Sequence, residues 1–148
     1  QGGLSRKALE YGLCQKRLID RAKTSEYSAA DWDALDDFVA IGEFERIGNF
    51  KEVMTYADMK AFLQRWCVDS HWEGSFKRIT EKDNVVILEL EERNTYNGHT
   101  NIVNSVSVYE FNPAGNTNNS WLSALTATSV CCAKGCSACI ATKIFSFA

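Results

Sequence analysis

The sequence predicts an α+β domain in which three helices pack into a curved, mixed or antiparallel sheet. Three observations support this prediction. Apolar residues recur at helical spacing near the start of the chain, two capping-box patterns mark further helix starts, and long runs with alternating side chains follow them. Because the helical patterns come mainly before the alternating runs, the helices should cover one face of an antiparallel sheet.

The first helix is predicted from Leu4 onward by apolar positions on one face, which are Leu4, Ala8, Tyr11, Leu18 and Ile19. Ser28–Asp31 has the capping-box pattern that begins a second helix, in which Trp32, Leu35 and Phe38 share a face. Thr55–Asp58 repeats the pattern before a third helix. Its apolar face is formed by Met59, Phe62, Leu63 and Trp66.

Strands are predicted over residues 41–47, 71–79, 85–92, 102–111 and 120–126. Asn97-Gly98 indicates a tight hairpin, and 82–84 and 112–115 indicate turns. In the strand that begins at Val85, side chains repeat every second residue, so Val86, Leu88, Leu90 and Glu92 share one face. If this face lines a core, Glu92 ends an apolar wall. Burial there would favour acid–base chemistry, and the alternative is that the strand has already reached solvent.

Composition excludes several classes of function. The 148 residues fit one domain, and the formal net charge of −3 does not predict nucleic-acid binding. No stretch approaches the roughly 20 apolar residues of a membrane span, and no signal-peptide pattern is seen. A cytoplasmic location, without membrane association, is therefore the default expectation, and there the six cysteines should be reduced.

The end of the chain differs in composition from the rest. All 19 acidic residues come before Ala114, and four of the cysteines lie at Cys131, Cys132, Cys136 and Cys139. We therefore predict a single domain over residues 4–126 and a cysteine-rich tail over 127–148. The Cys136-x-x-Cys139 spacing would suit a zinc ligand pair, but the two cysteine pairs are nearly contiguous and no histidine is near. A metal-free tail is the favoured interpretation.

The order of elements resembles the cone-shaped α+β barrel superfamily. The resemblance is carried by residues 38–46, 56–66, 84–93 and 105–115, and it spans roughly residues 4–125. This superfamily includes ketosteroid isomerase, limonene-epoxide hydrolase, scytalone dehydratase and SnoaL-type polyketide cyclases. The resemblance implies a pocket for apolar small molecules in the mouth of the cone, and in many members a homodimer.

The resemblance transfers few catalytic residues. The Arg-x-Asp of the epoxide hydrolases is absent, because the corresponding strand reads Leu90-Glu91-Glu92. Trp121 matches their tryptophan but is followed by Leu122 and Ser123. In the isomerase pattern the general base falls at Glu45 or Arg46, an oxyanion donor falls at Ser107, and Tyr11 lies near the position of the donor tyrosine.

We therefore expect a small-molecule enzyme of the isomerase, cyclase or dehydratase type that acts on an apolar substrate without metal or organic cofactor. Glu45 or Glu92 would be the general base, Tyr11 or Tyr109 the hydrogen-bond donor, and His71 a reserve acid–base group. The substrate would contact Phe62, Trp66, Leu88, Leu90, Ser107, Tyr109 and Trp121. The alternatives are a non-catalytic binding module and a dimerisation domain with the same fold.

A homodimer is predicted from the other face of the strand over 102–111. Ser107, Tyr109 and Phe111 share the face assigned to the cavity, so Val106 and Val108 form an apolar stripe on the convex face. An exposed apolar stripe of this kind is typical of a contact with a partner subunit.

Overall fold

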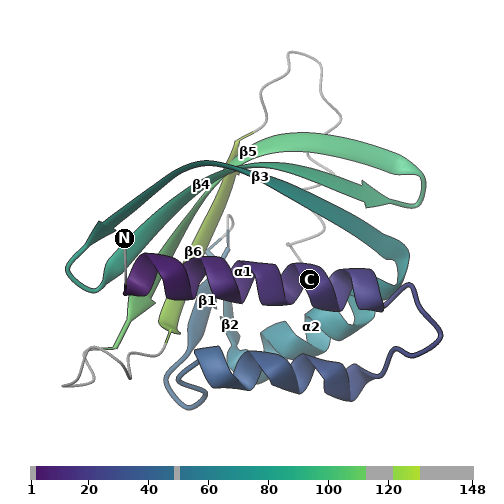
Figure 1. Cartoon of the computed structure of the whole chain (residues 1–148), viewed down its shortest axis with the longest axis horizontal. Helices are drawn as coiled ribbons and strands as arrows, with labels where there is room; N and C mark the ends of the chain where they lie inside the picture. Colours follow the sequence, from purple (N-terminus) through teal and green to yellow (C-terminus); the bar gives the residue numbers. More distant parts are fainter. Residues whose placement is uncertain (1–2, 49–50, 113–121, 131–148) are drawn as a thin grey trace.

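The computed structural model describes residues 3–48, 51–112 and 122–130. Its helices are α1 (Leu4–Arg21), the 3₁₀-helix η1 (Ala29–Phe38) and α2 (Tyr56–Asp69). Its strands are β1 (Glu45–Ile47), β2 (Val53–Thr55), β3 (Ser70–Lys82), β4 (Val85–Tyr96), β5 (His99–Phe111) and β6 (Leu122–Val130). The long strands arch over α1, with η1 and α2 beyond it, as the sequence predicts (Figure 1).

Within the described residues the strands form one sheet in the order β2-β1-β6-β5-β4-β3. The pairs are antiparallel except β1 and β6, which run parallel, so the sheet is mixed. The register shifts between Phe76 and Arg78 in β3 and between Glu110 and Phe111 in β5. Such irregularities bend a strand and increase its twist, which is consistent with the curvature of the sheet.

The start of α1 is attached to the sheet by a side chain from β3. Gly3, before the helix, gives no side-chain cap, so the free backbone N–H groups of the first turn need another acceptor. The backbone N–H of Ser5 donates to Glu81 Oε2 at 2.8 Å. Hydrogen bonds from Ser5 also hold the pKa of Glu81 below its ordinary value. This contact helps to fix α1 across the concave face.

Both predicted capping boxes are present. Ser28 and Asp31 form the reciprocal pair before η1, and Thr55 and Asp58 form it before α2. The helix after Ser28 is 3₁₀ rather than α, but Trp32 and Leu35 still lie on its buried face. The buried face of α2 consists of Tyr56, Met59, Phe62, Leu63, Trp66 and Cys67.

The hairpin predicted at Asn97-Gly98 is also present. Asn97 and Gly98 have φ values of 50° and 77°, the positive pair that a tight two-residue turn between β4 and β5 requires. Glycine takes this conformation without a steric penalty, which is why the dipeptide is a reliable hairpin signal.

Other boundaries differ from the prediction. β1 is confined to Glu45–Ile47 because residues 41–43 form a turn, and β2 was not predicted because three residues are too few to show an alternation. β6 runs to Val130, past the predicted domain end at residue 126. The cysteines from Cys131 onward, Trp121 and most of the turn at 112–115 lie outside the described residues, so the division into domain and tail stays a prediction.

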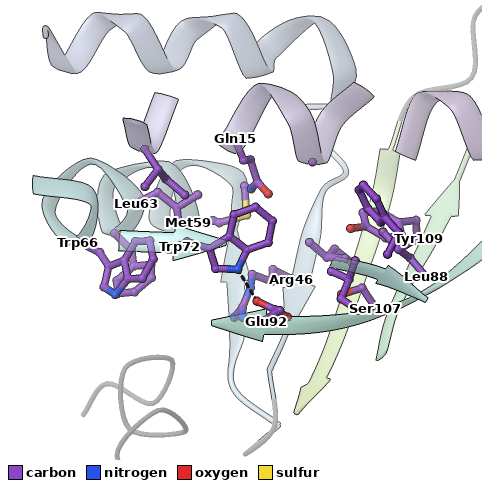
Figure 2. A pocket seen from close by; sticks show the side chains of 16 residues that line it. Gln15, Arg46, Met59, Leu63, Trp66, Trp72, Leu88, Glu92, Ser107 and Tyr109 are labelled. Atoms are coloured by element: carbon purple, nitrogen blue, oxygen red, sulfur yellow. Dashed lines mark hydrogen bonds between the residues drawn. The ribbon is translucent and has the colours of Figure 1, made fainter. Parts of the chain in front are cut away.

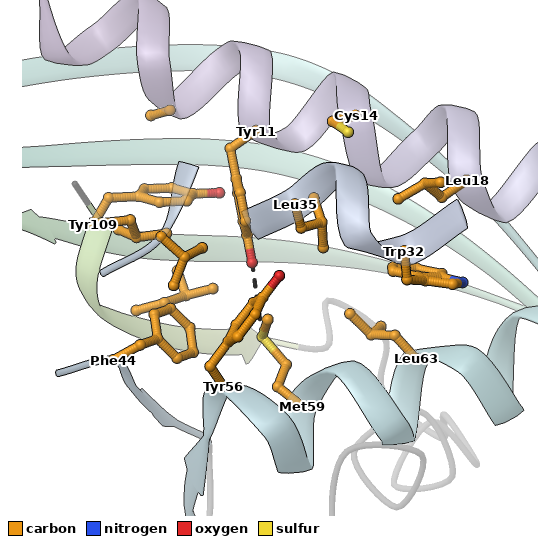
Figure 3. Packing of buried hydrophobic residues seen from close by; sticks show 14 of the residues in the cluster. Tyr11, Cys14, Leu18, Trp32, Leu35, Phe44, Tyr56, Met59, Leu63 and Tyr109 are labelled. Carbon is orange, nitrogen blue, oxygen red and sulfur yellow. Dashed lines mark hydrogen bonds between the residues drawn. The ribbon is translucent and has the colours of Figure 1, made fainter. Parts of the chain in front are cut away.

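One hydrophobic core fills the space between the helices and the concave face of the sheet. Tyr11, Trp32, Leu35, Val86 and Leu88 are each at most 1% exposed. Edge-to-face ring contacts join Tyr11 to Tyr109, and Phe44 to Tyr56 (Figure 3). Tyr11 makes a further contact of this kind with Phe38. None of the helices in the described part of the chain is long and apolar enough to cross a membrane.

The convex face of the sheet carries the apolar side chains that predict a homodimer. Ile87, Ile102 and Val106 are 37%, 49% and 38% exposed, and Val108 lies beside Ile87 in the β4–β5 register. We propose that a second copy of the chain covers this stripe.

Val108→Asp should then convert a dimer to a monomer in light scattering, because a charge at a two-fold interface is buried twice. Leu13→Asp, at a position of α1 that is 47% exposed and lies away from the convex face, should leave the mass unchanged. Equal masses for parent and Val108→Asp would contradict the proposal.

Candidate functional site

A pocket of about 120 Å³ lies between the helices and the concave face of the sheet. Residues from α1, α2 and five strands line it, and most of its wall is apolar (Figure 2). The lining residues are Gly12, Gln15, Ile19, Arg46, Met59, Phe62, Leu63, Trp66, Trp72, Phe76, Leu88, Leu90, Glu92, Ser107, Tyr109 and Leu125. The face shared by Leu88, Leu90 and Glu92 is therefore a pocket wall, as the strand alternation predicts.

Glu92 is the carboxylate in this lining. Its Oε2 accepts a hydrogen bond from Trp72 Nε1 at 2.6 Å, and its Oε1 accepts one from the buried hydroxyl of Ser105. The two donors come from the strands on either side of β4. Together they orient the carboxylate, because each of its two oxygen atoms accepts one of these hydrogen bonds.

Arg46 supplies a buried positive charge to the same pocket. In β1 it faces inward and is 7% exposed, whereas its neighbour Glu45 is exposed to solvent. Burial lowers the pKa of Arg46, and the negative charges of Glu52 and Glu92, together with the Tyr11 hydroxyl group, oppose that shift. Arg46 and Glu92 lie close together in the pocket lining (Figure 2). A guanidinium there can stabilise negative charge on an oxygen atom of a ligand.

Tyr109 and Ser107 add hydroxyl groups from β5. Burial raises the pKa of Tyr109 above its ordinary range, with a further contribution from the charge of Glu92, while a hydrogen bond with Ser107 acts in the opposite direction. The phenol therefore remains protonated near neutral pH and is able to donate a hydrogen bond.

Tyr11 lies next to the pocket but not in its lining. Its hydroxyl donates to Met59 Sδ at 3.7 Å (Figure 3). The same hydroxyl accepts a hydrogen bond from Gln15 Nε2 at 3.1 Å. Burial raises the pKa of Tyr11, so this group is also neutral. In this arrangement Tyr11 supports Met59 and Gln15, which do line the pocket.

The structure brings together most of the residues predicted for the site. Those found in the pocket lining are Glu92, Phe62, Trp66, Leu88, Leu90, Ser107 and Tyr109. Glu45 and His71 are exposed and lie outside this lining, and Trp121 lies outside the described residues. Of the two sequence positions considered for the isomerase-like base, the strand directs Arg46, not Glu45, into the pocket.

Sequence reasoning missed Trp72 and Gln15. The signal for Trp72 was present, because it lies on the alternating run that begins at Ser70. Gln15 had no such signal, since a glutamine on an amphipathic helix usually faces solvent. For metals, the part of the chain that the structure describes contains no group of three or more His, Cys, Asp or Glu side chains able to hold an ion.

Solved structures with the same arrangement are NTF2-like proteins. An NTF2-like protein of unknown function from Pseudomonas aeruginosa has a TM-score of 0.61 at 11% identity, with 84% of this chain and 96% of the other covered. A provisionally assigned SnoaL-like polyketide cyclase from Jannaschia has a TM-score of 0.59 at 11% identity, covering 87% and 89%. A provisionally assigned polyketide cyclase from Xanthomonas campestris has a TM-score of 0.59 at 17% identity, covering 82% and 89%.

No protein-family profile matches the chain, and comparison with curated proteins finds no match. At these identities the structural similarity shows the fold alone. The chain therefore has an NTF2-like fold, and the predicted resemblance to the cone-shaped α+β barrel proteins, SnoaL-like cyclases among them, is confirmed at that level.

Removing the buried charge of Arg46 should be costly. In Arg46→Met the methylene stem is largely kept, but Glu92 and Glu52 lose the positive charge that acts on both. Loss of a nearby positive charge from half-buried carboxylates typically costs about 1–3 kcal/mol. Urea unfolding should show a loss of this order, against about 0.5 kcal/mol or less for Arg93→Met at an exposed position. Equal losses in the two variants would mean that Arg46 does not act as a buried counter-charge.

Proposed function

We propose that the protein is a small-molecule enzyme of the isomerase, cyclase or dehydratase type, with Glu92 as its acid–base group. The observation that carries the proposal is the position of Glu92, whose carboxylate lies in a mostly apolar pocket wall close to Arg46, with the Tyr109 hydroxyl in the same lining. The NTF2-like fold and the provisional cyclase assignments of two structural neighbours support it.

The chemistry would be proton transfer next to a carbonyl group. The Glu92 carboxylate would remove a proton from the carbon beside the carbonyl, leaving an enolate whose negative charge lies mainly on oxygen. Arg46 and the neutral Tyr109 hydroxyl would stabilise that oxygen, and the proton held on Glu92 would return to a carbon or leave with a hydroxyl group. All of these roles use side chains of this chain.

The charges of the site favour a neutral substrate. Arg46 is the positive group in the lining, and it interacts with two carboxylates, Glu92 in the pocket and Glu52 in the loop before β2. An anionic ligand would find no excess positive charge in the pocket, so the free-energy cost of removing its charge from water would not be offset. An apolar ketone would instead bury its rings against Phe62, Trp66 and Leu90, with its oxygen toward Arg46.

A non-catalytic binding module is the second candidate, and the hydrogen bonds of Glu92 favour it. Each carboxylate oxygen already accepts a hydrogen bond from the protein. A carboxylate whose two oxygen atoms both accept hydrogen bonds from the protein has fewer lone pairs left for a substrate proton, so the pocket would recognise a polar group of the ligand without transferring a proton.

An assay of hydrogen–deuterium exchange on a ketone distinguishes the acid–base enzyme from the non-catalytic binding module. 2-Tetralone is a neutral bicyclic ketone with exchangeable protons beside its carbonyl, and their replacement by deuterium in D₂O is followed by proton NMR. An acid–base enzyme should accelerate the exchange, and Glu92→Gln should reduce that acceleration by about 10²–10⁴ because a positioned base contributes this much. A binding module should quench Trp66 and Trp72 fluorescence without accelerating exchange.

Two matched variants serve as controls. Glu91→Gln removes an exposed carboxylate from the neighbouring position of β4, where it forms a surface ion pair with Lys77 at 3.7 Å. Glu45→Gln removes the other carboxylate that the sequence suggests as a base. Both should keep the parent exchange rate. Full activity in Glu92→Gln, or its loss in Glu45→Gln, would contradict the assignment of Glu92.

A further inference from the structure

Trp72 lies unusually close to the backbone of its own strand. A Cβ atom placed on Gly74 would lie 2.7 Å from two atoms of the Trp72 six-membered ring, Cη2 and Cζ2. Real Cβ atoms essentially never approach this closely, so the indole occupies the space that a side chain at position 74 would need. Residues 72 and 74 share the concave face of β3, because strand side chains alternate.

The register of the sheet explains where the indole is directed. Gly74 is paired with Glu92 across β3 and β4, whereas Trp72 is paired with Asn94. A tryptophan side chain at position 72 that projected perpendicular to the sheet would lie next to Asn94. By lying over Gly74, Trp72 instead places its Nε1 2.6 Å from Glu92 Oε2, while its ring still lines the pocket (Figure 2).

We infer that Trp72 is a positioning residue for Glu92, and that Gly74 is required because its lack of a side chain lets the indole reach the carboxylate. The effect on proton transfer rests on the proposed function, whereas the hydrogen-bond geometry does not. Because the indole lines the pocket as well as holding Glu92, a ligand packed on Trp72 contacts the group that orients the base.

Three other residues also act on the Glu92 carboxylate. Ser105 from β5 donates to the second carboxylate oxygen, and Arg46 from β1 brings a positive charge. Tyr109 from β5 is a neutral phenol whose pKa is raised by burial and, to a smaller extent, by the Glu92 charge. Trp72 is thus the donor contributed by β3. Its removal should leave the other groups in place.

The first test measures the hydrogen bond itself. The chain has four tryptophans, so the indole N–H signal of Trp72 must first be assigned in the ¹H–¹⁵N spectrum. It is the signal that disappears in Trp72→Phe. Its exchange with D₂O should be slow in the parent and at least about tenfold faster in Glu92→Ala and in Gly74→Ala, since each removes the bond. Gly42→Ala is the matched control, because a Cβ at Gly42 meets no atom within 4 Å. Unchanged exchange in Gly74→Ala or in Glu92→Ala would overturn the inference.

The second test separates kcat from KM in the exchange of 2-tetralone. Trp72→Phe and Gly74→Ala should each lower kcat about tenfold or more while KM changes much less, because a misoriented carboxylate slows proton transfer more than it weakens binding. The double variant should lower kcat no further, since both changes remove the same bond. Additive losses, or an unchanged kcat in both single variants, would contradict the inference. If the parent shows no catalysed exchange, the proposed function fails while the indole measurement still decides the geometry.

Discussion

The two-residue period of the curved sheet is the constraint on which core and pocket both depend. Along β4 the inward positions Val86, Leu88 and Leu90 are 0%, 1% and 6% exposed, while Ile87 between them is 37% exposed. The same period places Glu92 next on the inward face. A single geometric rule therefore builds the apolar wall against which α1 and α2 pack, and it ends that wall with a carboxylate at the pocket.

The sequence predicts this part of the molecule well because local rules decide it. Strand alternation predicts the placement of Glu92, Ser107 and Tyr109, and the capping boxes predict where η1 and α2 begin. It does not decide between Glu45 and Arg46, because a three-residue strand shows too short an alternation to set its phase. That phase depends on the pairing of β1 with β6, which joins Arg46 to Leu125 far along the chain.

The roles of Trp72 and Gln15 also cannot be predicted from local sequence patterns. The position of the indole depends on a neighbour two residues away that lacks a side chain and on a register with β4, which no local pattern contains. Gln15 faces the pocket because its amide is bonded to Tyr11 on the preceding turn of α1. The functional surface thus combines residues predictable from periodicity with residues whose roles arise only when distant strands pair. The site as a whole is a mostly apolar enclosure with a few polar groups, contributed by α1, β1, β4 and β5.

We propose that this pocket binds a neutral apolar ketone with its oxygen toward Arg46 and the carbon beside its carbonyl group toward Glu92. A crystal structure of the protein soaked with 6-bromo-2-tetralone tests it most directly, because the anomalous signal of bromine locates the aromatic end of the molecule. We expect bromine near Trp66 and Phe76 and the carbonyl oxygen within hydrogen-bonding distance of Arg46 or Tyr109. Bromine located on the convex face, or the ring reversed so that the carbonyl lies among the apolar side chains, would contradict the account.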